Sequence, residues 1–248
     1  MIKLVNVDRS WFTHTAAAAK QYIDVMDGRV NIPRELRDVA LEGVIEWPAD
    51  MALGLPQSDL TVIEVSSLKR HVIDTYELNA HKVWGAAKAT GLDYRPIVQG
   101  NTESLPTESV LKPLRVAHTT EEELGETLSA IQARVGSPIL LVDHLFSPLA
   151  DGSPAAERVK LTATLRTVSA ESGFTLFETE SVIKAHGVVV ALLDQNHYRP
   201  EFEETVGLSM LPALKKLLNE RRSDVSDNCG GEKLDPNLGH APSPTRLS

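Results

Sequence analysis

The chain has 248 residues, of which 42% are hydrophobic and 24% are charged, and its formal net charge is -9 at pH 7. This composition is that of an ordinary globular protein, and the acidic balance argues against a broad nucleic-acid surface, which needs an excess of Lys and Arg. The single cysteine, Cys229, excludes an internal disulfide and a cysteine-rich metal site.

The start of the chain and its apolar runs bear on its location. Residues 1–11 lack the basic segment and apolar core of a signal peptide. No apolar run approaches the ~20 residues that span a bilayer. These features predict a cytoplasmic protein that has neither a membrane nor a nucleic acid as a partner.

The first third of the chain predicts two strands and two helices. Residues 2–7 could form a short first strand, and apolar residues at helical spacing predict a helix over residues 11–27. Pro33 then opens a second helix. Residues 59–67 are β-branched and form the strongest early strand. Glu64 inside that strand marks either a sheet edge or a carboxylate that is kept there for a purpose.

The part of the chain from residue 120 to residue 187 has the clearest rhythm. It predicts helices at 120–135, 154–172 and 179–187, with intervening strands at 138–142 and 174–177. Such alternation is typical of an α/β fold with a parallel sheet. We therefore expect a three-layer α/β/α fold with a mainly parallel, flavodoxin-like sheet.

The C-terminal part predicts one more helix and then a change in composition. Residues 200–222 form an amphipathic helix that Pro212 should kink or divide. Residues 223–248 are rich in Asp, Asn, Gly, Pro and Ser, which predicts a disordered tail. The expected organisation is thus one domain over residues 1–222, followed by the tail.

Asp194 and His197 are the first candidates for chemistry. At this spacing in a loop the two side chains can touch, so that the carboxylate orients the imidazole and stabilises its protonated form. Asn196 lies between them in the sequence. The alternative interpretation is a helix-capping aspartate and a surface histidine.

Other candidates lie where the predicted strands end. Sites in parallel sheets collect beyond the carboxyl ends of the strands, where Ser66, Ser67 and His144 should join the 194–197 loop. The two serines could donate hydrogen bonds to an oxyanion, or they could simply form a turn. Asp143 and His144, together with the 194–197 loop, could also ligate a metal, but no spacing rule supports this and we expect no metal.

Residues 194–200 resemble the last block of the SGNH (GDSL-like) hydrolases and acyltransferases, an Asp-x-x-His loop before the final helix. Residues 59–65 resemble the strand before the oxyanion-hole loop of that family, and residues 138–142 and 174–177 resemble the two strands that follow. The resemblance implies an SGNH fold and a Ser-His-Asp mechanism in which His197 is the base.

The chain departs from the family pattern in two blocks. Residues 7–10 read Val-Asp-Arg-Ser where the family has Gly-Asp-Ser, so that Ser10 is the candidate nucleophile by position. A turn or helix N-cap is the alternative role for Ser10, and the nucleophile could instead lie upstream of Met1, in which case the N-terminal block is incomplete. The family's Gly-x-Asn-Asp block is replaced by Ser66 to Lys69.

Two functions follow from these patterns. The first is an esterase or O-acyltransferase that acts on an ester of a carbohydrate or small metabolite. The alternative is an inactive SGNH-like binding module in a carbohydrate or natural-product pathway. No glycine-rich phosphate loop is present, so we expect no nucleotide or other cofactor. The acyl group, the acceptor and the oligomeric state are left open.

Overall fold

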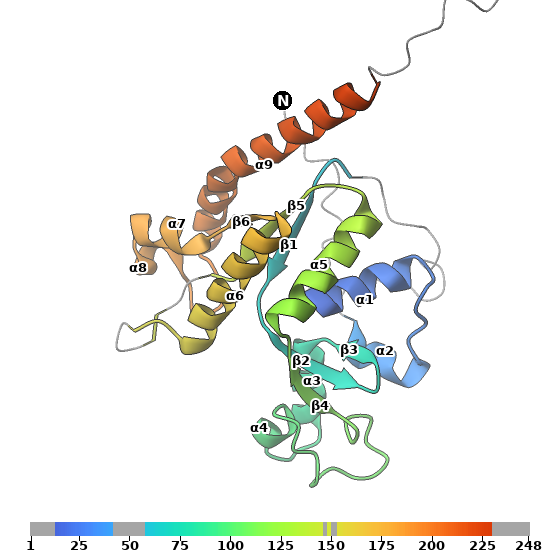
Figure 1. The fold of residues 1–248 in the computed structure, drawn as a ribbon. Helices are drawn as coiled ribbons and strands as arrows, with labels where there is room; N and C mark the ends of the chain where they lie inside the picture. The colour runs from blue at the N-terminus through green and yellow to red at the C-terminus, as the bar shows by residue number, and fades with distance from the viewer. Residues whose placement is uncertain (1–12, 42–57, 146–147, 150–152, 230–248) are drawn as a thin grey trace, which may run out of the picture.

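Two small sheets organise the residues that the computed structural model describes, which are 13–41, 58–145, 148–149 and 153–229 (Figure 1). The strands are β1 (Thr61–Val65), β2 (Lys69–Ile73), β3 (Tyr76–Leu78), β4 (Arg115–His118), β5 (Ile139–Asp143) and β6 (Thr175–Phe177). The helices are α1 (Ala16–Met26), the 3-10 helix η1 (Arg34–Leu36), α2 (Arg37–Ala40), α3 (Ala80–Ala89), α4 (Tyr94–Ile97), α5 (Glu121–Val135), α6 (Ala156–Ser172), α7 (Thr179–His186), α8 (Val188–Ala191) and α9 (Pro200–Cys229).

The parallel sheet has the order β1-β5-β6 and is covered on both faces. Ile139 and Leu141 of β5 pack into a core with residues of α1, α5 and α6, whereas Leu140 and Val142 pack on the other side against Leu217 of α9. This is why β5 is apolar along its length, as strands of buried parallel sheets are. Figure 1 shows α5 and α6 in front of this sheet and α1 beside α5, while α9 packs on the opposite face.

The second sheet is antiparallel, with the order β3-β2-β4. It corrects the expectation of a mainly parallel sheet, because it contains three of the six described strands. A two-residue turn at Asp74 and Thr75 joins β2 to β3, and Asp74 has a φ of 53°. Aspartate tolerates this left-handed conformation better than most residues, which lets the hairpin close tightly. The fold is therefore a mixed α/β arrangement.

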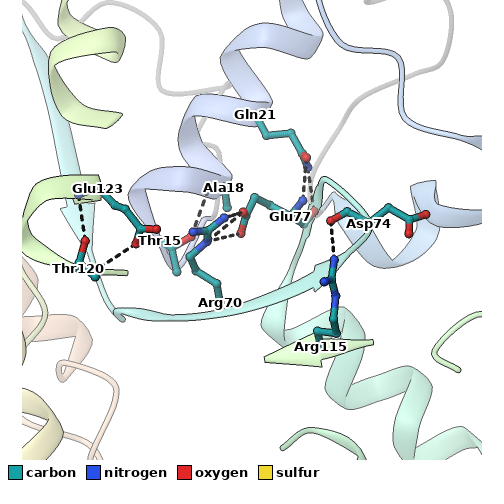
Figure 2. Close-up of polar contacts among 9 residues, drawn as sticks. All are labelled: Thr15, Ala18, Gln21, Arg70, Asp74, Glu77, Arg115, Thr120 and Glu123. Atoms are coloured by element: carbon teal, nitrogen blue, oxygen red, sulfur yellow. Dashed lines mark hydrogen bonds and ion pairs between the residues drawn. The ribbon is translucent and has the colours of Figure 1, made fainter. Parts of the chain in front are cut away.

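Helix α1 packs against α5 and is tied to the antiparallel sheet (Figure 2). The Gln21 side-chain amide donates to the Glu77 carbonyl and its oxygen accepts the Glu77 N–H, both at 2.8 Å. The Glu77 carboxylate in turn pairs with Arg70 of β2. Across the hairpin, Arg115 of β4 donates to the Asp74 carbonyl at 3.0 Å. Buried polar groups need such partners, and here they fix α1 against β3.

The alternation predicted between residues 120 and 187 is confirmed, as α5, β5, α6, β6 and α7. The start of α5 is a capping box, in which Thr120 and Glu123 each accept the backbone N–H of the other. Helix α1 begins at Ala16, after Thr15 accepts the Ala18 N–H. The strand expected at residues 2–7 and the candidate Ser10 lie outside the described residues.

Helix α9 differs from its prediction at two points. It runs as a single helix through Pro212 and continues to Cys229, beyond the expected end at Arg222. Pro212 occupies an exposed position of this helix. Residues 230–248 are outside the described part of the chain, and the disordered tail remains a prediction. Of the described helices, none combines the length and the apolar character needed to cross a membrane.

Candidate functional site

Asp194 and His197 lie in the loop between α8 and α9. The loop is closed by a bridge between Leu192 and Tyr198, and the Leu193 N–H donates to the His197 carbonyl at 2.9 Å. Nδ1 of His197 lies 2.8 Å from Oδ2 of Asp194 and 2.9 Å from Oδ1. The two side chains that the sequence singled out therefore touch in the way that an orienting carboxylate and an imidazole do.

The environment of this pair is open. The His197 and Asp194 side chains are 64% and 52% exposed. The Asn196 N–H donates to Asp194 at 2.7 Å, and this bond, followed by that of His197, holds the pKa of Asp194 below its usual range. Asp194 is thus charged at neutral pH, and the Nε2 edge of His197 is accessible to a reactant.

Ser66 and Ser67 end β1, and their backbone amides are already engaged. Both N–H groups donate to the His14 carbonyl, at 3.0 and 2.9 Å. The Ser66 hydroxyl donates to Oε1 of Glu64 at 3.1 Å, and the Ser67 hydroxyl accepts the Lys69 N–H at 2.9 Å. Ser67 therefore forms the turn into β2, and an oxyanion could use these amides only if it displaced the His14 carbonyl.

Glu64 and His144 form a second carboxylate–imidazole pair. Nδ1 of His144 lies 2.6 Å from Oε1 of Glu64, and the imidazole is 13% exposed while the carboxylate is 51% exposed. Partial burial acts to raise the pKa of Glu64, but the hydrogen bond and charge of His144, the Ser66 hydroxyl and the Arg158 charge outweigh it. The net effect is a lowered pKa, so Glu64 carries its charge at neutral pH.

Arg158 connects the end of β1 to the Asp194 loop. From the first turns of α6, its Nη1 donates to the Ser66 carbonyl at 2.8 Å, and its Nη2 donates to Oδ1 of Asn196 at 3.0 Å. A planar guanidinium suits such a two-armed contact. Arg158 thereby completes a continuous series of hydrogen bonds from His144 to His197. The residues between them in this series are, in order, Glu64, Ser66, Arg158, Asn196 and Asp194.

All of these residues lie inside one family match. The model of the TviD N-terminal domain matches residues 1–213. The chain belongs to this family. No model of an SGNH family matches, and no curated protein and no solved structure matches the chain significantly. The SGNH resemblance thus stays a likeness in the order of elements and in the last block.

Asp143 has a structural part in this TviD N-terminal domain. Its buried carboxylate accepts the Thr179 N–H at 2.7 Å, at the start of α7, and the Thr162 hydroxyl at 3.0 Å. Burial is the main cause that raises the pKa of Asp143, against the effect of these bonds. Asp143 thus faces α6 and α7, while His144 faces Glu64. Within the described residues, no group of three or more His, Cys, Asp or Glu side chains is placed to hold a metal ion.

A group of histidines lies beside the Glu64 pair. The ring of His14 stands edge-on to that of His81, with 4.5 Å between the centroids. Burial, and then the charges of His81, His144 and His71, lower the pKa of His14 to about 4. His14 is therefore neutral at pH 7. It lines, with Lys69 and His71, a cavity of about 10 Å³, which is room for roughly one water molecule.

Two features of the TviD N-terminal domain site were not predicted as parts of it. The Glu64–His144 contact joins positions far apart in the sequence, and its one signal was a glutamate inside a β-branched strand. Arg158 gave no signal, because an arginine near a helix start is ordinary. The structure thus gathers Ser66, His144 and the 194–197 loop at the carboxyl end of the parallel sheet.

Proposed function

We propose that the chain is an SGNH-like esterase or O-acyltransferase that acts on an ester of a carbohydrate. The Asp194–His197 hydrogen bond carries the proposal, because it presents an oriented base on a loop that Arg158 ties to the end of the parallel sheet. The family is named for TviD, a Vi capsule biosynthesis protein, which supports a role in capsule polysaccharide biosynthesis and a polysaccharide hydroxyl as the acyl acceptor.

In the proposed reaction, His197 takes the proton of a serine hydroxyl while Asp194 stabilises the imidazolium that forms. Ser10 is the candidate serine. It precedes His14 by four residues in the sequence. His14 in turn is fixed to the end of β1 through Ser66 and Ser67.

The developing oxyanion needs donors, and the proposal draws them from the same edge of the sheet. The hydroxyls of Ser66 and Ser67 and the side-chain amide nitrogen of Asn196 are the candidates. Asn196 is the best oriented of the three, because Arg158 binds its Oδ1 atom and so leaves the nitrogen to donate. Preorganised donors of this kind contribute about 3–4 kcal/mol each to a transition state.

The test is ester turnover by the whole chain and by His197→Gln. We expect His197→Gln to lower turnover on acetylated sugars by roughly 10³-fold or more. His118→Gln, at an exposed histidine of β4, is the matched control and should keep the unaltered rate. A fluorophosphonate probe should label Ser10, and Ser10→Ala should abolish that labelling. Full activity in His197→Gln would contradict the proposal.

A second candidate function is a carbohydrate-binding module without catalysis. It is favoured by the engagement of both strand-end amides with the His14 carbonyl, which occupies the donors an oxyanion loop would offer. Absence of probe labelling and of ester turnover, together with retained binding of a capsule polysaccharide in a titration, would favour this function over the first.

A further inference from the structure

The Glu64–His144 pair has no part in the Ser-His-Asp scheme, yet its geometry is at least as good as that of Asp194 and His197. Its nitrogen–oxygen distance is 2.6 Å, against 2.8 Å in the loop pair. Its imidazole is 13% exposed, against 64% for His197. A charged hydrogen bond that is sheltered from water is stronger than one in solvent.

The sheet itself makes this pair. Glu64 lies opposite Val142 in the parallel ladder of β1 and β5, and both point away from the core under α5 and α6. His144 follows Val142 by two positions, so it belongs to the same face of the sheet by strand alternation. The imidazole thereby reaches across the strand ends to the carboxylate.

The surroundings leave one ring nitrogen for a reactant. Glu64 binds Nδ1 of His144, and no other hydrogen bond to this ring is found among the described residues. The titratable groups that interact with the pair include Arg158, whose charge acts on Glu64, His14, on which the His144 charge acts, and Tyr198, on which the Glu64 charge acts. When Nδ1 is held in this way, Nε2 is the atom that exchanges a proton.

We infer that His144, oriented by Glu64, is a second acid–base group of the site, which serves the alcohol oxygen of the sugar while His197 serves the serine. This inference rests on the proposed function. Glu64 is a positioning residue in it, since it acts through His144. The carboxylate of each pair balances the charge of its own imidazolium.

The proton balance closes with two histidines. In the first step the serine oxygen bonds to the acyl carbon of the donor ester and gives its proton to His197. The bond between the acyl carbon and the donor alcohol breaks, and this alcohol takes a proton from His144. In the second step the acceptor hydroxyl bonds to the acyl carbon and returns a proton to His144, while the serine oxygen leaves and takes its proton back from His197.

The experiment compares two acetyl esters with different leaving groups. A sugar alkoxide needs a proton as it leaves, whereas p-nitrophenolate leaves without one. We expect His144→Gln to slow cleavage of an acetylated methyl glycoside by about 10²- to 10⁴-fold, the range for general acid–base catalysis. The first-turnover burst of p-nitrophenolate from p-nitrophenyl acetate, which reports only the formation of the acyl-enzyme, should keep the unaltered rate. His197→Gln should slow both esters.

Glu64→Gln should show the same selective loss in smaller measure, and Glu64→Asp should restore part of it. His118→Gln is again the control, and thermal unfolding checks that each variant folds. A loss of equal size on both esters, or full sugar-ester turnover in His144→Gln, would overturn the role of His144 alone. If the unaltered protein cleaves neither ester, the proposed function fails and this inference fails with it.

Discussion

The two carboxylate–imidazole pairs are built in opposite ways. Asp194 and His197 are three positions apart in one surface loop, and both side chains are more than half exposed. Glu64 and His144 are 80 positions apart and meet across neighbouring strands, with the imidazole largely sheltered. Local loop geometry thus sets the first pair and sheet register sets the second. Substitutions in Asp194 and His197, the loop pair, can change that contact without changing the sheet. The contact of Glu64 and His144, the strand pair, depends on how β1 and β5 align.

The largest expected effect on ester turnover comes from replacing the carboxylate of Asp194, and the comparison is with the same kind of change at Glu64. Asp194→Asn keeps the size of the side chain but offers His197 an amide, which favours the wrong tautomer. If the proposed triad operates, turnover should fall by about 10⁴-fold on every ester, as the corresponding change does in a serine protease. Glu64→Gln, measured beside it, should be the milder change and should spare the first-turnover burst of p-nitrophenolate from the aryl ester. An equal loss in both variants would remove the distinction between the pairs.

A smaller effect is expected where the pairs are joined. Arg158→Lys retains the charge but cannot reach both Ser66 and Asn196 with a planar fork. Because a displacement of ~1 Å at a catalytic group can cost about 10²-fold, we expect a loss of that order in ester turnover. The free energy of unfolding should fall by about 1–3 kcal/mol, since one of the two partners loses its donor.

The control for Arg158 lies on the same helix. Arg166 is more exposed and pairs with Glu178. Exposed ion pairs contribute only about 0–1 kcal/mol, so Arg166→Lys should change neither turnover nor unfolding beyond that range. Unfolding in urea and initial rates on the two esters supply both measurements. If Arg158→Lys changes turnover and stability no more than Arg166→Lys does, the Arg158 contacts to Ser66 and Asn196 are not needed for activity.

The smallest expected effect is on acid stability and concerns the strand pair. The folded pKa of Glu64 is lowered from its ordinary value of 4.5, so the unfolded chain binds a proton there at a higher pH than the folded chain does. The pair therefore stabilises the fold above pH 4.5, and this stabilisation is lost as the pH falls through the folded pKa.

His144→Gln removes the donor that lowers this pKa. The difference in unfolding free energy between the unaltered protein and His144→Gln should accordingly have its largest value near pH 6 and decrease as the pH falls below 4.5. Urea unfolding at a series of pH values measures it, and a carbon NMR titration of the Glu64 carboxyl gives its pKa directly. A difference that does not depend on pH would mean that packing, not charge, sets the effect of His144.

The same contrast explains how much of the site could be predicted. The Asp194–His197 contact follows from a three-residue spacing, and such local geometry is visible in a sequence. The Glu64–His144 contact depends on the pairing of β1 with β5, and the Arg158 contacts join positions 92 and 38 apart. Contacts between such distant positions form only when the sheet is assembled, and hydrophobic periodicity does not specify which strands pair. The roles of the catalytic residues stay predictions.

The fold divides in the same way. Helices α5 and α6 and the buried strand β5 were predicted correctly, because each carries its own hydrophobic pattern. The antiparallel sheet was missed, because β2 and β4 begin with charged residues and show neither a continuous apolar run nor a strict polar–apolar alternation. The Asp74 turn offered a signal, but aspartate in a turn has many other uses.

The two hydrogen bonds between Gln21 and Glu77 have a mechanical consequence. A helix held to a strand at one point can still rotate about it, but a donor and an acceptor on the same amide lock both sliding and rotation. We therefore expect helix α1 and the β2–β3 hairpin to move together. His14 precedes α1, and its carbonyl accepts the backbone N–H groups of Ser66 and Ser67. A displacement of the β2–β3 hairpin should therefore be transmitted to the end of β1.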